Sequence, residues 1–158
     1  MALQVRRVVT GHDQNGKAKV LIDEVAKNVI SARPGAQSCV FWTTEGFPVI
    51  NDGDADACAR KVGTTLAGGI VFRVVEFGPG VSPRNHRTNS IDFAVVMKGE
   101  IDMELDDSVV HLKAGDVLVQ RGTIHNWVNN GTEPCQIAFV LVDAKPVTAG
   151  GKTLPAHG

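Results

Sequence analysis

Short apolar runs separated by turn residues constrain the fold of this chain more than any other sequence feature. Runs rich in Val, Ile, Phe and Leu that are bounded by Gly, Pro, Asn and Asp predict β-strands. The strands are expected at Val71–Phe77, Phe93–Lys98, Glu100–Leu105, Val109–Leu112, Val117–Gln120 and Gln136–Val142, with weaker ones at Arg7–Thr10, Val20–Asp23 and Ser38–Thr44. Only Ala55–Val62, with Asp54 as its cap, favours a short helix. Many strands without intervening helices predict an all-β antiparallel sandwich or barrel.

Length and charge exclude several classes of protein. The chain has 158 residues, which fits one domain, and its 16 Lys and Arg against 17 Asp and Glu give a net charge of −1. This balance argues against a nucleic-acid-binding protein and a basic membrane-surface module. No apolar run approaches the roughly 20 residues of a membrane-spanning helix, and the first residues do not resemble a signal peptide. Three cysteines without a CxxC pair indicate free thiols, so we expect a cytoplasmic protein.

Two histidine-bearing segments within residues 78–129 carry the most specific motifs. The first contains Gly80, His86, Asp92 and Gly99, and the second contains Gly115, Asp116, Gly122, His125 and Asn129. Together they resemble the two motifs of the cupin superfamily. The first family motif is Gly, His-x-His, Glu and Gly, and the second is Gly-Asp, then Pro-x-Gly-x-x-His and Asn. This chain has one histidine where the first motif has two: with His86 in the first position, Thr88 stands in the second, and with a different gap His86 takes the second. Asp92 replaces the family's Glu.

The resemblance implies a fold and an assembly. The fold is a single double-stranded β-helix, the cupin or jelly-roll barrel, over residues 1–144 with extra N-terminal strands, and the motif residues line its mouth. Residues 145–158 have little to bury and are expected to form a flexible C-terminal tail. Barrels of this type commonly pair through sheet faces or exchanged strands, so we expect a homodimer.

His86, Asp92 and His125 are the candidate catalytic and metal-binding residues. Two imidazoles and one carboxylate suit divalent Fe, Mn, Zn, Ni or Co. His86 and Asp92 are an even number of residues apart, so both face the same side if the segment is extended. A metal held there would polarise a carbonyl group or bind dioxygen. Without a metal, a buried His and Asp suffice for acid–base catalysis.

Arginines near both histidines point to an anionic substrate. Arg84 and Arg87 flank His86, and Arg121 precedes His125. Because guanidinium groups pair with carboxylates, Arg87 and Arg121 are expected to bind a small carboxylate or an enolisable oxo acid. Trp127 is expected to form a wall of the pocket.

The leading hypothesis is a metal-dependent cupin enzyme that catalyses decarboxylation, dehydration or isomerisation of a small oxo or hydroxy acid. One alternative is a metal-dependent dioxygenase on the same site. Metal-free acid–base catalysis and a non-catalytic small-ligand-binding barrel are the others. The sequence does not choose among them, because one fold supports many chemistries.

Overall fold

The computed structural model describes residues 3–158, and its regular elements are strands. The strands are β1 (Arg6–His12), β2 (Ala18–Val25), β3 (Val29–Arg33), β4 (Ala36–Glu45), β5 (Gly69–Phe77), β6 (Ser90–Lys98), β7 (Glu100–Glu104), β8 (Val109–Lys113), β9 (Val117–Arg121), β10 (Asn126–Val128), β11 (Cys135–Asp143), β12 (Val147–Ala149) and β13 (Lys152–Leu154). The all-β prediction is confirmed. The helix predicted at Ala55–Val62 is wrong, because these residues form turns and bends. Residues 3–158 contain no helix that is long and apolar enough to cross a membrane.

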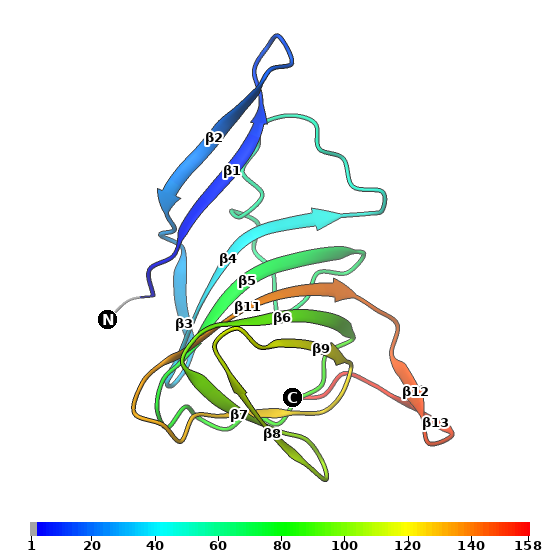
Figure 1. The fold of residues 1–158 in the computed structure, drawn as a ribbon. Coiled ribbons are helices and arrows are strands. Elements are labelled where there is room, and N and C mark those ends of the chain that lie inside the picture. Colours follow the sequence, from blue (N-terminus) through cyan, green and yellow to red (C-terminus); the bar gives the residue numbers. More distant parts are fainter. Residues whose placement is uncertain (1–2) are drawn as a thin grey trace.

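Two sheets form the barrel. The larger has six strands in the order β3-β4-β5-β11-β6-β9, and the smaller has the order β10-β7-β8. The larger sheet curves over the smaller one in Figure 1. Strand β11, late in the chain, pairs antiparallel with both β5 and β6. Val71, Ile101 and Ile137 lie almost fully buried in the core of this barrel. This arrangement confirms the predicted double-stranded β-helix.

A hairpin of β1 and β2 forms the extra N-terminal strands. It projects from the barrel at the top of Figure 1 and forms its own two-stranded sheet. A small second core, which includes Leu3, Ala26 and Phe41, lies at its base. The buried guanidinium group of Arg7 binds the Asp56 carboxylate. The hairpin is thereby tied to the long connection between β4 and β5.

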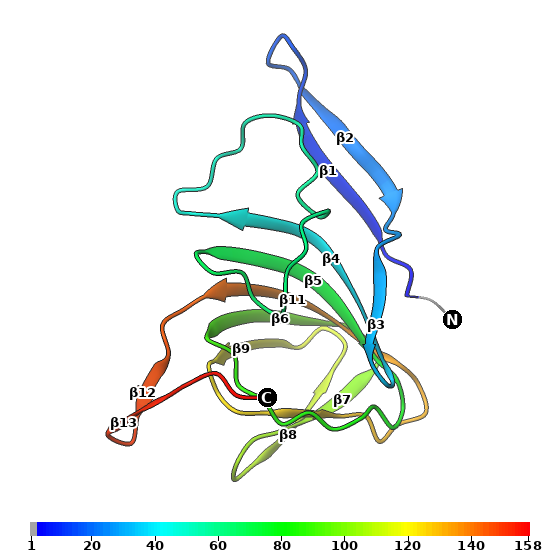
Figure 2. The same cartoon turned by 180° about the vertical axis from the view of Figure 1, so that it is seen from behind.

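This connection, residues 46–68, passes across one face of the large sheet, as Figure 2 shows. The Thr43 hydroxyl donates a hydrogen bond to the Ala57 carbonyl over 2.7 Å. The Arg73 Nη2 donates to the carbonyls of Gly63 and Thr64. These bonds hold the connection at the edge of the barrel cavity, which residues 62–64 help to line.

The C-terminal segment is more ordered than its composition predicts. Strands β12 and β13 pair antiparallel. Arg87 and His157 then exchange two backbone hydrogen bonds of 2.8 and 2.9 Å, and the Arg84 Nε donates to the Gly158 carbonyl over 3.1 Å. The structure thus gives residues 145–158 regular backbone pairing, and the flexibility expected of this tail stays a prediction. Backbone pairing with a distant loop holds this segment, and a short polar sequence does not reveal such pairing.

Gly99, the last glycine of the first motif, provides a test of the fold. Its φ is 76°, and an added Cβ would lie 2.5 Å from the Pro134 carbonyl oxygen. Gly16 has a similar φ of 74° but open space around it. We expect Gly16→Ala to lower the free energy of unfolding by about 1–2 kcal/mol through backbone strain alone. Gly99→Ala should cost at least about 3 kcal/mol, because the clash adds to the strain. Urea unfolding of both variants measures the difference, and equal losses would contradict the described packing.

Candidate active site

His86 and His125 are brought together by the backbone. Each donates its N–H to the carbonyl of the other over 3.0 Å, which forms an isolated antiparallel bridge between the two motif segments. The two rings lie side by side with centroids 4.2 Å apart. Both side chains are buried and line the barrel cavity. The sequence prediction that these histidines share one site agrees with this placement.

Local hydrogen bonds fix the tautomer of both rings. The Nδ1 of His86 lies 2.9 Å from the Arg84 carbonyl, and the Nδ1 of His125 lies 2.9 Å from the Thr123 carbonyl. A carbonyl oxygen only accepts, so each Nδ1 carries the proton. In the neutral rings the Nε2 atoms therefore keep their lone pairs. In both loops the ring thus binds the carbonyl two residues before it, which leaves the Nε2 of each histidine free to accept a proton.

Burial keeps both imidazoles neutral near pH 7. Burial first, and then the neighbouring His86, lower the pKa of His125 to about 4. The pKa of His86 is also lowered, mainly by burial and in part by the charge of Arg84. Neutral rings act as proton acceptors, so the pair is suited to general base catalysis.

Asp92 lies in the same cavity but does not join the histidines. It is buried on β6, and its Oδ1 accepts a 2.6 Å hydrogen bond from the Ser90 hydroxyl. Thr88, the residue in the vacant histidine position of the motif, shares a 2.8 Å hydrogen bond with Ser90. Burial raises the pKa of Asp92 more than the Ser90 hydroxyl and the charge of Arg73 lower it.

The donor set does not fit the metal that the family resemblance implies. Across residues 3–158, no group of three or more His, Cys, Asp or Glu side chains is close enough to hold an ion. Two imidazole nitrogens are available, but the expected third ligand, Asp92, does not complete the group. A stable site of the two-histidine, one-carboxylate type needs all three. The prediction of a metal bound by His86, Asp92 and His125 is therefore not supported by this arrangement.

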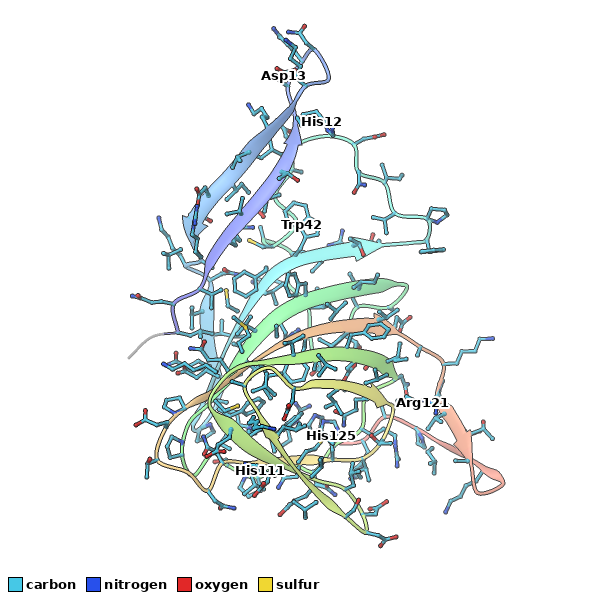
Figure 3. The ribbon with its side chains drawn as sticks, viewed as in Figure 1. His12, Asp13, Trp42, His111, Arg121 and His125 are labelled. Carbon is cyan, nitrogen blue, oxygen red and sulfur yellow. The ribbon has the colours of Figure 1, made fainter. Side chains whose placement is uncertain are left out.

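The two arginines expected to bind substrate lie outside the cavity lining. Arg121 is exposed at the end of β9, where Figure 3 labels it, because its strand neighbour Gln120 takes the buried position. Arg87 binds the Gly122 carbonyl through its Nε over 3.0 Å. Neither residue lines the cavity, and their role in substrate binding stays a prediction.

Three other arginines line the cavity instead, namely Arg33 on β3, Arg73 on β5 and Arg84 in the loop before His86. Of these three, only Arg84 was singled out from the sequence. Arg73 had a signal that could have found it, because it lies on the same strand face as buried Val71 and Phe77 in a mostly apolar strand. Arg33 had no such signal, since β3 was not predicted.

Aromatic side chains complete the cavity, which has a volume of about 340 Å³. Trp127 is buried with its ring edge-on to His125 at 5.9 Å, so its prediction as a wall is supported by its position. The ring centroids of Phe77 and Phe139 lie 5.6 and 6.0 Å from that of Trp127. His125 lies inside the barrel in Figure 3, whereas His12 lies at the far end of the N-terminal hairpin.

Comparisons with known proteins identify the family. The family described as "Cupin domain" matches residues 73–142. The cupin-domain-containing oxidoreductase fogC of Aspergillus ruber (strain CBS 135680) is 33% identical over 98% of this chain and 80% of its own length. The chain is a cupin. Phomopsin biosynthesis cluster protein C' of Diaporthe leptostromiformis is 37% identical over 94% of this cupin and 83% of its own length. The predicted family resemblance is confirmed.

A solved structure agrees with this cupin in fold alone. The cupin domain of Schizosaccharomyces pombe Cnp3 superposes with a TM-score of 0.51 at 12% identity and covers 87% of each chain. Some motif residues stabilise the fold and take no part in the site. The Asn129 side chain, for example, donates to the carbonyls of Phe77 and Glu133, both over 2.9 Å. The last residue of the second motif therefore stabilises the barrel.

The buried histidine pair makes the stability of this cupin depend on pH. Folded His125 has a pKa of about 4, below its ordinary 6.5, so only the unfolded chain takes up this proton between these values. We expect the free energy of unfolding to fall as the pH drops from 6.5 to 4, by roughly 3 kcal/mol from His125 alone. Urea unfolding at pH 7 and pH 4 measures this loss.

The His125→Asn variant is the control for this prediction. Asp92 contributes with the opposite sign at low pH, because its raised pKa favours proton uptake by the folded state. The difference between the wild type and the variant removes that contribution. If both proteins lose the same stability, His125 is not held neutral by burial.

Proposed function

We propose that this cupin is a small-molecule enzyme that isomerises or dehydrates an oxo or hydroxy acid by proton transfer at carbon. One observation carries the proposal. The Nδ1 atoms of His86 and His125 both donate to backbone carbonyls, so two neutral Nε2 bases stand beside each other in an apolar cavity. Positioned bases of this kind supply general base catalysis, typically worth about 10²–10⁴-fold in rate.

His86 is the stronger candidate for the base, because burial depresses the pKa of His125 as far as about 4. The Nε2 of His86 takes a proton from the carbon next to the substrate carbonyl. The C–H electron pair becomes a carbon–carbon double bond, and the carbonyl electrons move to the oxygen. The guanidinium group of Arg84, in the same cavity, stabilises the negative charge of this enolate oxygen.

The second half of the reaction returns the proton. Delivery from the His86 imidazolium to a carbon further along the conjugated system yields an isomer. Delivery to a departing β-hydroxyl group, which leaves with its electron pair as water, yields the dehydrated product. Asp92 on β6 lines the same cavity and is the second group that could exchange a proton with the substrate. Trp127 and Phe139 exclude water from the reacting carbon.

A second candidate is an oxidoreductase, and the names of the relatives favour it. The proteins fogC and virC, the latter of Hypocrea virens (strain Gv29-8 / FGSC 10586), are both named cupin-domain-containing oxidoreductases. The virC protein is 32% identical over 89% of this chain and 77% of its own length. Such a reaction would require an electron acceptor, and the described donor set does not supply a three-residue metal site for one.

Solvent exchange of an enolisable proton tests the proposal. We expect the EDTA-treated wild type to accelerate loss of the C3 proton signals of phenylpyruvate in D2O, followed by proton NMR. His86→Asn should slow this exchange by about 10²-fold or more, because the base is removed. His111→Asn is the matched control, since His111 is exposed on β8 and pairs with Asp102 and Glu100. The control should exchange at the wild-type rate.

Two results would contradict the proposal. Exchange that is equal in the wild type and in His86→Asn would remove the base from the mechanism. Turnover that appears only with added ferrous iron and consumes dioxygen, measured with an oxygen electrode, would replace proton transfer with the oxidoreductase reaction.

A further inference from the structure

The cavity carries more positive than negative charge. Arg33, Arg73 and Arg84 line it, and Asp92 is its one carboxylate among the lining residues. The charge of this carboxylate acts on Arg73, and one carboxylate is fewer than three guanidinium groups. The two histidines are neutral and add no negative charge. Three guanidinium groups in one apolar cavity are therefore without equal compensation, and this arrangement is costly unless an anion binds.

The three arginines also lie close enough to act on one another. Burial lowers the pKa of Arg33 and of Arg73, and the charge of Arg84 lowers both further. The charges of Arg84 and Arg33 both act on His86 and His125. The positive groups thus adjoin the histidine pair and are not scattered around the barrel.

Several of their hydrogen-bond donors are buried without a partner. These are the Nε and Nη2 of Arg33 and the Nε of Arg73. The remaining contacts hold the groups in place. The Arg33 guanidinium carbon lies 5.7 Å from the centre of the Phe77 ring, and Arg73 Nη2 binds the Gly63 and Thr64 carbonyls. Guanidinium groups that line one cavity and keep N–H donors without partners suit a carboxylate, which accepts such donors in pairs.

Most of the remaining lining residues of the cavity are apolar, although Gln37, Ser38, Thr64 and Thr88 also contribute. Its walls include Val75, Phe77, Trp127, Phe139 and Leu141, and its volume of about 340 Å³ admits a molecule of roughly a dozen heavy atoms. An inorganic anion would leave these walls without contacts. The ligand therefore combines a carboxylate with an aromatic or branched aliphatic body.

We propose that Arg33 and Arg73, assisted by Arg84, form the carboxylate subsite that selects an apolar-bodied organic acid as the substrate. The subsite rests on the proposed function only for the position of the reacting carbon beside His86 and His125. Arg33 and Arg73 determine specificity and orient the substrate. They come from β3 and β5, outside both family motifs.

Binding of two isosteric probes tests the subsite. The probes are 4-phenylbutanoate and its neutral amide, 4-phenylbutanamide, titrated by calorimetry at pH 7.5 and constant ionic strength. We expect the wild type to bind the carboxylate at least 10-fold more tightly than the amide. Arg33→Gln and Arg73→Gln should each lower carboxylate affinity about 10-fold or more, with amide affinity changed less than about 2-fold. Arg6→Gln, at an exposed ion pair of the N-terminal hairpin, should change neither affinity.

Further arms keep the test decisive. Arg33→Lys and Arg73→Lys keep the positive charge but lose the paired N–H donors of the guanidinium group, so their carboxylate affinity should be lower than that of the wild type. These variants serve as the test if a Gln variant does not fold. Inorganic phosphate should not displace the carboxylate at equal concentration, and displacement would overturn the choice of an organic acid. The subsite would be overturned if the wild type bound the two probes equally. It would also be overturned if both Lys variants and any folded Gln variant kept the full carboxylate affinity.

The same titration separates this inference from the proposed reaction. His86→Asn should keep the preference for the carboxylate, because the arginines are unchanged. If the preference persists while the wild type shows no proton exchange, the subsite stands and the proposed reaction fails. If exchange occurs but the preference is absent, the reaction stands and the subsite fails.

Discussion

The paired backbone hydrogen bonds between His86 and His125 are the constraint on which the site depends. These bonds join a loop that precedes β6 to a turn that follows β9, so they connect segments far apart in the chain. The same loops supply the carbonyls that bind both Nδ1 atoms. The position, the tautomer and the mutual distance of the two imidazoles are therefore set by the main chain. Side-chain packing against Trp127 adds a wall but does not determine the pairing.

The strands could be predicted because their signal is local. Alternation in residues 101–106 predicted a strand at Glu100–Leu105, and β7 covers Glu100–Glu104. The apolar run at 136–142 lies within β11, which extends one residue further at each end. The helix at Ala55–Val62 could not be rejected from sequence, because distant residues decide it. Arg7 binds Asp56, and Thr43 binds the Ala57 carbonyl, so tertiary contacts override a short segment's preference. Strands β12 and β13 escaped prediction because their sequence is polar and short.

The site could likewise be predicted where the signal is local, and not where distant residues decide it. The motif spacing identified His86, His125 and Asp92, and all three line one cavity. Spacing did not reveal that the carboxylate stays with Ser90 on its own strand, apart from the imidazoles. Proximity in sequence suggested Arg87 and Arg121, whereas the cavity receives arginines from β3 and β5. A charge near a motif in the chain is a poor guide to a charge near it in space.

The position of Arg73 couples two parts of the molecule. Its Nη2 holds the connection between β4 and β5, its Nε is buried without a partner, and the residue lines the cavity. Binding equilibria that share one group are reciprocal. A carboxylate bound by Arg73, as we propose, would therefore be coupled to the free energy that fixes Gly63 and Thr64. Under that proposal, a substitution in this loop would alter ligand affinity although the loop carries no chemistry of its own.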